Sequence, residues 1–266
     1  MKTILLINDD GIHSIGLRVL KKRLEKLGKV MVVAPLDEKS GIGKALSTNS
    51  IKVTETQLAD GIKAHAITGT PADAYLLAVN KIMKKSPDLL VAGINLGPNL
   101  GIDDLLNSGT LGAALEAAIH NVPAIAVSYC LREITKQMRE KADVSADELE
   151  VAVTFAEKIA EYVLEHGMPK NVDIISVNVP EKATSKNAEV TTVSYKGYGD
   201  IHKRQHKDFY RIGGWILSSY PDDKNGTDLH AVKTKGHVSI TPIKINFHHD
   251  TKSLEKLRKL LVAKQI

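Results

Sequence analysis

The sequence predicts an α/β protein with a Rossmann-like core, in which a parallel sheet lies between two layers of helices. Short β-branched runs alternate with segments whose apolar residues recur at helical spacing through the first half of the chain. Strands that alternate with helices favour a parallel sheet covered on both faces. We expect a β-rich extension and a terminal helix to follow this three-layer αβα core.

The first βαβ unit is the clearest. Its two apolar runs and the leucines between them are Thr3–Ile7, Leu17, Leu20, Leu24, Leu27 and Val30–Val33. Weaker strand candidates follow at Ile51–Thr54 and Ala64–Ile67. Thr70 then supplies an N-cap, Pro71 the first helical position and Asp73 an early acid, which predicts a helix to about Lys84.

The next elements continue the alternation of strands and helices. The predicted strands are Leu89–Ala92, Ala124–Ser128 and Ile174–Val179, and the predicted helices are Thr110–His120 and a segment from the capping-box pattern Ser145–Glu148 to about Glu165. We expect a glycine-rich loop at 93–108 and a polar stretch at 131–144.

The pattern changes near residue 180, so we expect a core at 1–180 and an extension at 181–266 within one functional domain. The extension has strand-like runs at 189–195, 209–218 and 237–247, which we interpret as antiparallel additions to the sheet. Residues 196–208 are polar and glycine-containing, which predicts an arm or lid.

A Lys-rich helix is expected from about Ser253. Its Leu254, Leu257 and Leu261 need an apolar partner, and a neighbouring subunit could supply one. This predicts an assembly in which 221–266 is exchanged or docked across a two-fold axis.

Composition excludes several classes of protein. Of 266 residues, 43% are hydrophobic and 25% charged, which is typical of a globular chain and not of a disordered one. The net charge of +5 and the 4% aromatic content give no basis for a DNA partner. No apolar run is long enough for a signal sequence or a membrane span, and the single Cys130 can form no internal disulfide. We therefore expect a cytoplasmic protein with no membrane partner.

Polar residues follow three of the predicted strands. The first strand ends in Asn8-Asp9-Asp10-Gly11, and the loops at 34–41 and 93–99 follow two others. Ligands bind at the carboxyl ends of the strands in an open α/β sheet, so the three loops should share one rim. Two carboxylates, a hydroxyl and an amide oxygen there would suit Mg²⁺ or Mn²⁺. The alternative is that Asp-Asp-Gly is only a turn and a helix cap.

Ser108, Gly109 and Thr110 directly precede a predicted helix, where backbone N–H groups and the helix dipole favour an anion. Plain N-capping is the alternative, both here and at Thr70. Beside a divalent metal the anion interpretation gains support, because phosphate chemistry commonly uses a metal and oriented N–H donors around the same oxygens. The sequence thus favours phosphate-ester hydrolysis.

Other patterns do not support a site. The run Gly41–Lys44 lacks the remaining residues of a Walker A loop, neighbouring strand residues at 248–250 would point to opposite faces, and Cys130 is expected to be a small apolar residue. A Mg²⁺-binding receiver domain of signalling proteins would need an Asp after a middle strand and a Lys after the last one. A non-catalytic nucleotide-binding module is a second alternative, separable by testing for metal-dependent phosphate release from AMP.

Several motifs in a fixed order carry a resemblance to a known family. They are Asn8-Asp9-Asp10-Gly11, Ala34-Pro35 with Ser40-Gly41, Thr68–Asp73, Gly93-Ile94-Asn95 with Gly97–Gly101, Ser108-Gly109-Thr110, Asn178-Val179-Pro180, Gly226-Thr227-Asp228 and Val238–Pro242. The chain resembles, almost end to end, the SurE family (survival protein E) of metal-dependent 5′/3′-nucleotidases.

The resemblance implies hydrolysis of nucleoside 5′- or 3′-monophosphates by subunits that form dimers or tetramers. It also implies one divalent metal ion per subunit, Mg²⁺ or Mn²⁺, held by Asp9, Asp10, Ser40 and Asn95. Substrate binding is assigned to Asn99, Ser108, Gly109 and Thr110, and catalysis to Asp9, Asp10 and Asn99. The chain departs from the family at 102–107, which is one residue longer than in some relatives, and at 182–224, which matches poorly.

Overall fold

The computed structural model describes residues 1–58, 61–131, 144–212, 217, 220–246 and 251–262. Within these residues the strands are β1 (Thr3–Ile7), β2 (Lys29–Pro35), β3 (Val53–Gln57), β4 (Lys63–Ile67), β5 (Leu89–Leu96), β6 (Ala124–Cys130), β7 (Ile174–Pro180), β8 (Ala188–Val190), β9 (His202–His206), β10 (Phe209–Ile212) and β11 (Val238–Ile243). The α-helices are α1 (Ile15–Leu24), α2 (Pro71–Leu77), α3 (Gly101–Asn107), α4 (Gly109–Ile119), α6 (Glu150–His166) and α7 (Glu255–Val262). Two π-helical turns, η1 (Ala78–Ile82) and η3 (His230–Thr234), and a 3₁₀ turn, η4 (Thr251–Leu254), complete the description.

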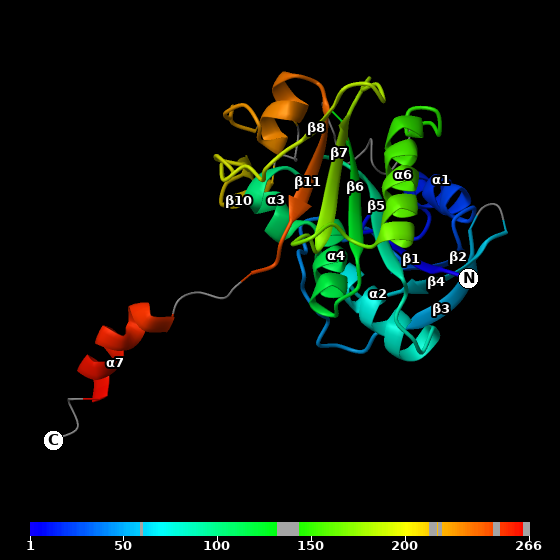
Figure 1. Ribbon diagram of the computed structural model, residues 1–266, viewed down its shortest axis with the longest axis horizontal. Coiled ribbons are helices and arrows are strands. Elements are labelled where there is room, and N and C mark those ends of the chain that lie inside the picture. The colour runs from blue at the N-terminus through cyan, green and yellow to red at the C-terminus, as the bar shows by residue number, and fades with distance from the viewer. Residues whose placement is uncertain (59–60, 132–143, 213–216, 218–219, 247–250, 263–266) are drawn as a thin grey trace.

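One mixed sheet organises the molecule (Figure 1). Within the described ranges its nine strands run in the order β3-β4-β2-β1-β5-β6-β7-β11-β8. Strands β4, β2, β1, β5, β6 and β7 run parallel to one another, as the alternation of strands and helices predicts. Strand β1 lies between β2 and β5, so the first residues after it face the middle of the carboxyl-end rim.

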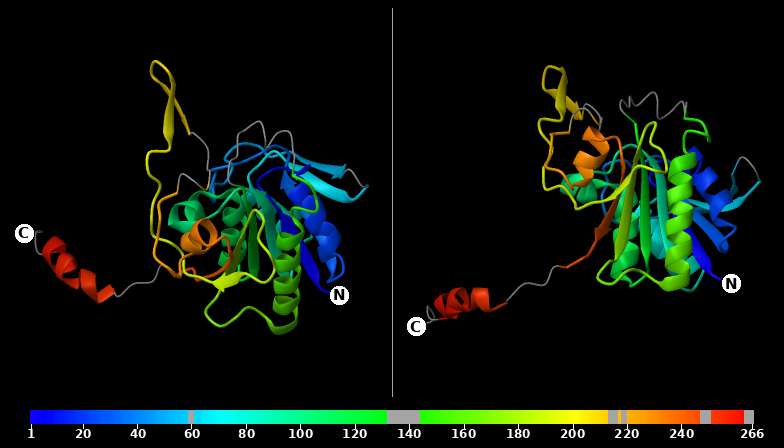
Figure 2. Two further views of the ribbon diagram at one scale, coloured as in Figure 1. Left: turned by 90° about the horizontal axis from the view of Figure 1, so that it is seen from above. Right: turned by 45° about the horizontal axis from the view of Figure 1, so that its top comes forward.

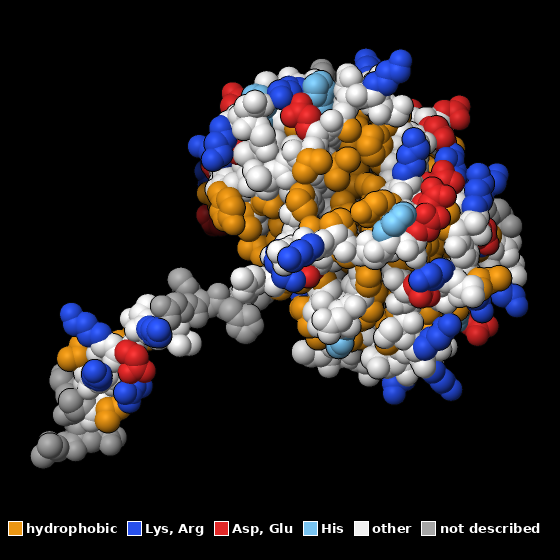
Figure 3. Space-filling model, in the orientation of Figure 1, with side chains coloured by type: hydrophobic (Ala, Val, Ile, Leu, Met, Phe, Trp, Pro, Cys, Tyr) orange, Lys and Arg blue, Asp and Glu red, His pale blue; other side chains and the backbone are white. Residues whose placement is uncertain are grey.

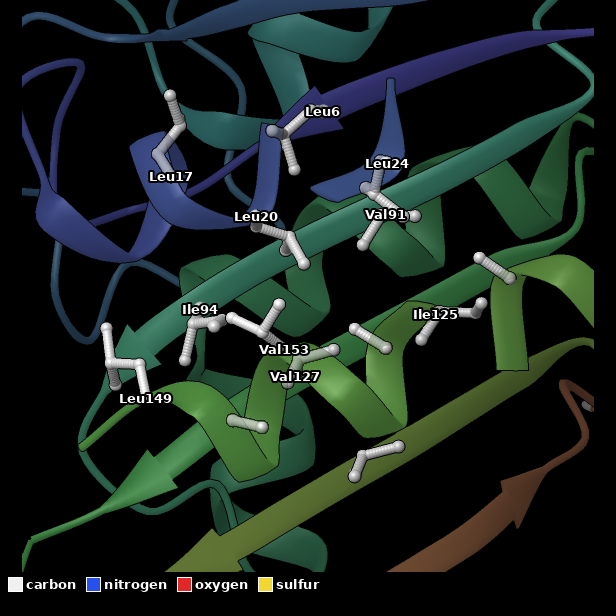
Figure 4. Close-up of a cluster of buried hydrophobic side chains, with 14 of the residues drawn as sticks. Leu6, Leu17, Leu20, Leu24, Val91, Ile94, Ile125, Val127, Leu149 and Val153 are labelled. Atoms are coloured by element: carbon white, nitrogen blue, oxygen red, sulfur yellow. The ribbon is translucent and has the colours of Figure 1, made fainter. Parts of the chain in front are cut away.

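Helices cover both faces of the sheet, which confirms the three-layer αβα prediction. Helices α1 and α6 pack on one face, where Leu17, Leu20 and Leu24 of α1 meet apolar side chains of the strands (Figure 4). Helices α2 and α4 pack on the other face, with Leu5 and Ile7 of β1 beneath them. The alternating directions of the β1 side chains thus serve two separate cores.

The segment 93–108 is more regular than predicted. Strand β5 continues to Leu96, with a register shift against β6 between Ala92 and Asn95. A Cβ on Gly93 would lie 2.3 Å from the Val127 carbonyl oxygen, so only glycine fits this close crossing. Helix α3 occupies most of the remaining segment. At its start, the N–H of Leu100 donates to Asp104 and the N–H of Gly101 donates to Asp228, which is 127 residues away. The local sequence gives no sign of this second contact.

The capping box at Ser145 and Glu148 is confirmed by reciprocal hydrogen bonds of 2.8 and 3.3 Å. Two i→i+3 bonds, from the N–H groups of Leu149 and Glu150, then form a tight turn. Regular α6 therefore begins at Glu150, later than predicted, and ends at His166.

The C-terminal extension is mixed. Strand β11 pairs antiparallel with β7, as predicted, but β8 is parallel to β11. Strands β9 and β10 form an exposed antiparallel hairpin that stands out from the body (Figure 2), so the segment predicted as an arm contains regular structure. No residue of α7 is buried. Residues 248–250, considered as metal ligands, lie outside the described residues.

Two local predictions have simple outcomes. Thr70 is an N-cap in a full capping box with Asp73, so it needs no ligand to account for it. Cys130 ends β6 with no exposed surface, and burial raises the pKa of its thiol well above the usual range. In the described part of the chain, no helix is both long and apolar enough to cross a membrane.

Candidate functional site

A pocket opens at the carboxyl ends of β1 and β5. Its lining is formed by Asp9, Ser40, Gly41, Asn95, Pro98, Asn99, Asp104, Asn107, Ser108 and Tyr198. The sequence-predicted residues Asp9, Ser40, Asn95, Asn99 and Ser108 are therefore brought to one place. Asp10, Gly109 and Thr110 are not part of the lining. Gly109 and Thr110 lie against the lining residue Asp9, and Asp10 binds Leu96, the neighbour of the lining residue Asn95.

Asp9 is 3% exposed, at the point where β1 ends. The hydroxyl of Thr110 donates a hydrogen bond to its Oδ1, and its carbonyl oxygen accepts the N–H of Lys39 at 2.8 Å. The first bond ties Asp9 to α4, and the second ties it to the loop that carries Ser40. The loops that follow β1 and β2 are thus joined at the pocket.

Asp10 is half-buried and turns toward the end of β5. Its Oδ2 accepts the N–H of Leu96 at 3.0 Å, one residue beyond Asn95. The side chain of Asn95 donates through Nδ2 to the carbonyl oxygen of Gly97 at 2.8 Å. That bond assigns the Nδ2 end of the amide, so Oδ1 is the atom of Asn95 that can meet a cation.

These residues fit a divalent metal ion. The donor set combines two carboxylates, a hydroxyl and an amide oxygen, all of them oxygen atoms, which Mg²⁺ and Mn²⁺ prefer over the His and Cys ligands of Zn²⁺. Among the described residues no group of three or more His, Cys, Asp and Glu gathers at one point. A set with only two carboxylates is consistent with that finding.

The N-terminus of α4 lies at the pocket, where its N-cap Ser108 is part of the lining. The hydroxyl of Ser108 caps the helix by accepting the N–H of Leu111 at 3.2 Å. The N–H groups of Gly109 and Thr110 lie in the first turn, where they have no partner within the helix. A Cβ on Gly109 would lie 2.8 Å from the Cβ of Asp9, so glycine permits the close approach of this helix end to Asp9.

Asn99 is held by buried polar groups on neighbouring strands. Its side-chain Nδ2 donates to the Ser128 hydroxyl at 2.8 Å, which leaves a second N–H on the same nitrogen that can donate to an anion. Its backbone N–H and carbonyl oxygen pair with the amide of Asn178, each at 2.9 Å. Asn178 has no exposed surface. Asn99 therefore has a fixed position beside the pocket.

Three lining residues were not singled out by the sequence: Asp104, Asn107 and Tyr198. Burial raises the pKa of Asp104 to about 6, although hydrogen bonds from Tyr198, Tyr220 and Leu100 act in the opposite direction. Asp104 and Asn107 lie in α3, within the segment predicted as a loop. Tyr198 lies in the segment that matches the family poorly, so its place in the pocket follows only from the three-dimensional structure.

The loop that carries Ser40 is anchored on α4. A Cβ on Gly112 would lie 2.3 Å from the carbonyl oxygen of Gly43, so the loop and the helix are in direct contact. The N–H of Gly43 donates to the carbonyl oxygen of Asn107 at 2.7 Å, and Lys44 forms an ion pair with the buried Glu116. The residues once compared with a Walker A loop thus serve this packing.

Comparisons with known proteins show the family of the chain. The family model described as "Survival protein SurE" matches residues 4–200. The 5′-nucleotidase SurE of Methanosarcina acetivorans is 37% identical over 249 residues, which cover 91% of this chain and 92% of that protein. The 5′-nucleotidase SurE of Archaeoglobus fulgidus is 41% identical over 254 residues, or 91% of each chain.

A solved structure shows the same fold. The crystal structure of the SurE protein from Aquifex aeolicus aligns with a TM-score of 0.73 and 30% identity, and the alignment covers 98% of this chain and 99% of that one. The match includes both the sheet core and the C-terminal extension. Sequence, fold and pocket therefore agree that the chain belongs to the SurE family of survival proteins.

Proposed function

We propose that this chain is a metal-dependent phosphomonoesterase that hydrolyses nucleoside 5′- or 3′-monophosphates to nucleoside and phosphate. Membership of the SurE family supports a nucleotide monophosphatase, since the relatives named 5′-nucleotidase SurE align over about nine-tenths of both chains. The single observation that carries the proposal in this structure is the pocket that joins the oxygen donors of Asp9, Ser40 and Asn95 to the N-terminus of α4.

Asp9, Asp10, Ser40 and Asn95 would hold one Mg²⁺ or Mn²⁺ ion per subunit. When bound, the ion would supply positive charge for the phosphate oxygens and for the attacking water. The burial of Asp9 and the hydrogen bonds from Thr110 and Leu96 keep the two carboxylates in fixed orientations. One of these carboxylates accepts the proton of the water as it attacks in line with the leaving oxygen, and that oxygen takes up a proton as its bond to phosphorus breaks, which gives the nucleoside.

The protein supplies hydrogen-bond donors on the other side of the phosphate. Asn99 offers the second N–H of its amide, and α4 offers the N–H groups of Gly109 and Thr110 together with its dipole. Negative charge on the phosphate oxygens is redistributed in the transition state, and donors that are already fixed stabilise it without reorganising. The hydrogen bonds from Asn99 to Ser128 and Asn178 provide that rigidity.

The experiment is a panel of metals and substrates on the purified protein. Phosphate release from AMP and from 3′-AMP should require added Mg²⁺ or Mn²⁺ after exhaustive EDTA treatment, with residual metal measured independently. Full activity in protein shown to be free of metal would contradict the role of the ion. No release from any nucleoside monophosphate under any metal would contradict the reaction.

A receiver domain is not favoured. Its phospho-accepting Asp would have to follow a central parallel strand. Here β5 ends in Asn95 and Leu96 and is followed by Gly97, and β6 ends in Tyr129 and Cys130 and is followed by Leu131. A binding module without catalysis is not favoured either, because the relatives that align over most of the chain are named as nucleotidases.

We also propose that residues 181–266 belong to the same functional domain and build a homodimer or homotetramer. The supporting observation is the exposure of the leucines of α7: Leu257, Leu260 and Leu261 are 51%, 62% and 68% exposed. Figure 3 shows hydrophobic side chains beside charged ones on this helix, and further hydrophobic side chains gathered on the body over β7 and β11. A second copy of the chain would cover both surfaces.

A further inference from the structure

Asp104 is a buried carboxylate that lines the pocket without belonging to the proposed metal ligands. It is 3% exposed and lies in α3. In the sequence it stands between two other lining residues, Asn99 and Ser108. A charged group at such a site requires specific partners, because burial without them is strongly unfavourable.

Three donors from three parts of the chain meet at this carboxylate. Its Oδ2 accepts the N–H of Leu100 at 2.7 Å and the hydroxyl of Tyr220 at 2.6 Å, and its Oδ1 accepts the hydroxyl of Tyr198. Both oxygens are thus used by protein groups. This arrangement suits a carboxylate that holds neighbours in place, and it does not suit one that binds a metal ion or donates a proton to a substrate.

One of the three donors, Tyr198, lines the pocket, and a second, Leu100, is the chain neighbour of the lining residue Asn99. Leu100 directly follows Asn99. The bond from its N–H to Asp104 therefore fixes the backbone after Asn99, and the bonds with Asn178 fix the backbone of Asn99 itself. Tyr198 lines the pocket itself, and its own N–H also donates to Asp103 at 2.5 Å. Asp104 therefore connects the backbone beside Asn99 with the side chain of Tyr198. Tyr198 lies four residues before β9, the first strand of the exposed hairpin.

The surroundings of Asp104 are apolar enough to make these bonds strong. Leu100, Cys130, Leu217, Tyr220, Leu229 and Val232 form a small separate core, with Tyr198 packed against it. Hydrogen bonds to a charged acceptor gain strength where water is excluded. A second carboxylate, Asp228, binds the N–H groups of Gly101, Ser194 and Leu229 in the same region, but it does not line the pocket.

We propose that Asp104 is a positioning residue of the reaction, whose carboxylate sets Asn99 and Tyr198 at the phosphate pocket. The inference rests on the proposed function, because it assigns Asp104 to the same site. It goes further by naming a residue outside the proposed metal ligands and substrate contacts, which acts through Asn99 and Tyr198. Asp104 thereby also links the pocket to the base of the β9–β10 hairpin.

The first test is Asp104→Asn, which keeps the size of the side chain and turns one acceptor into a donor. The kcat/KM for AMP should fall by about 10- to 100-fold, the range observed when outer partners of a site are removed. Affinity for inorganic phosphate, measured by calorimetry with Mn²⁺ present, should fall as well. Affinity for Mn²⁺ alone should stay the same, because the proposed ligands are not bound to Asp104.

A matched pair of tyrosine variants separates positioning from stability. Tyr198→Phe and Tyr220→Phe each remove one hydroxyl from Asp104, but only Tyr198 lines the pocket. Tyr198→Phe should weaken phosphate binding and turnover, whereas Tyr220→Phe should mainly lower the melting temperature. Equal losses of phosphate affinity in the two variants would overturn the proposal. This pair also carries the test if Asp104→Asn does not fold.

A double-mutant cycle with Asn99→Ala tests the route of the effect. If Asp104 acts through Asn99, Asp104→Asn should reduce kcat/KM by much less in the Asn99→Ala background than in the native protein. Equal losses in both backgrounds, or a parallel loss of Mn²⁺ affinity, would overturn the proposal. Phosphate binding needs no turnover, so an inactive native protein whose phosphate affinity still depends on Asp104 would contradict the proposed function alone.

Discussion

The sheet core and the exposed elements of the C-terminal extension, β9, β10 and α7, place their side chains in opposite ways. Every residue of β1, β5, β6 and β7 is buried, whereas no residue of β9, β10 or α7 is buried. Full burial of a leucine stabilises a fold by about 1.5–3 kcal/mol relative to exposure. The core therefore gains its stability within one chain, while the leucines of α7 gain none until something covers them.

This difference separates the two tasks of the molecule. The proposed ligands Asp9 and Ser40 follow strands β1 and β2, and Asn95 lies near the end of β5, so the packed sheet can hold them within the narrow limits that catalysis requires. Tyr198 and Asp104 lie where the core meets the extension. The extension therefore reaches the pocket through Tyr198 but supplies none of the proposed ligands.

The largest expected effect is that of Asp10→Asn, which keeps the shape of the side chain and removes one negative charge. Weaker metal binding should lower activity by at least about 10²-fold while the fold remains intact. Asp37→Asn, an exposed change in the neighbouring loop, is the matched control and should leave activity unchanged. If Asp10→Asn instead lowers only the melting temperature, with native kcat and metal affinity, Asp10 is a turn residue.

The second prediction compares the tail with the core. Removing residues 251–266 should convert a dimer or tetramer to a smaller species in light scattering, because it removes the exposed leucines of α7. Metal affinity should be unchanged, since the proposed ligands lie in the first 100 residues. A native protein that is already monomeric at micromolar concentration would contradict the assembly.

The truncation also has a stability control. Leu6→Ala removes a side chain with no exposed surface and should destabilise the protein by about 2–5 kcal/mol. In the monomeric state, loss of the whole tail should have a smaller effect than this single substitution. The reverse order, measured by denaturant unfolding of the monomer, would show that α7 packs on its own chain.

The smallest expected effect concerns the pH dependence of stability. Burial raises the folded-state pKa of Asp104 to about 6, above its ordinary value near 3.8. The folded state thus binds this proton more tightly than the unfolded state, so the contribution is present below about pH 4 and is lost as the pH rises to about 6. Asp104→Asn lacks this contribution.

The melting temperature of the native protein minus that of Asp104→Asn should therefore be larger at pH 4.5 than at pH 8. A change of about 2–4 °C is expected for each kcal/mol of linkage. The pKa of Asp228 is also raised by burial, and because the two carboxylates repel one another, Asp228→Asn should be measured beside Asp104→Asn. A difference that does not change with pH would show that the pKa of Asp104 is not raised.

Local patterns were sufficient for most of the fold. The apolar runs placed β1, β2, β5, β6 and β7, and the capping signals at Thr70 and Ser145 correspond to hydrogen bonds in the structure. Helix α3 was missed because its N-terminus is stabilised by Asp228 from far along the chain, while its own sequence follows Gly97 and Pro98. The parallel pairing of β8 with β11 also depends on a connection that no local signal fixes.

The candidate site was predicted to the extent that it follows strand ends. Asp9, Ser40, Asn95, Asn99 and Ser108 line one pocket because parallel strands bring their carboxyl ends to the same rim. Their roles as metal ligands and substrate contacts stay predictions until tested. Asp104 and Tyr198 could not be found this way, because their contact joins residues 94 positions apart and Tyr198 lies in the segment of poor family resemblance.

The position of β1 between β2 and β5 also bears on how the protein is made. Asp9 leaves the ribosome early, but its partner Thr110 is 101 residues further along the chain. At a synthesis rate of about 5–20 residues per second, Thr110 follows Asp9 only after several seconds. Until β5 and the start of α4 emerge, β1 is an apolar strand with an open edge. A nascent chain that stalls before residue 110 would therefore expose this strand to chaperones and could not yet form the pocket.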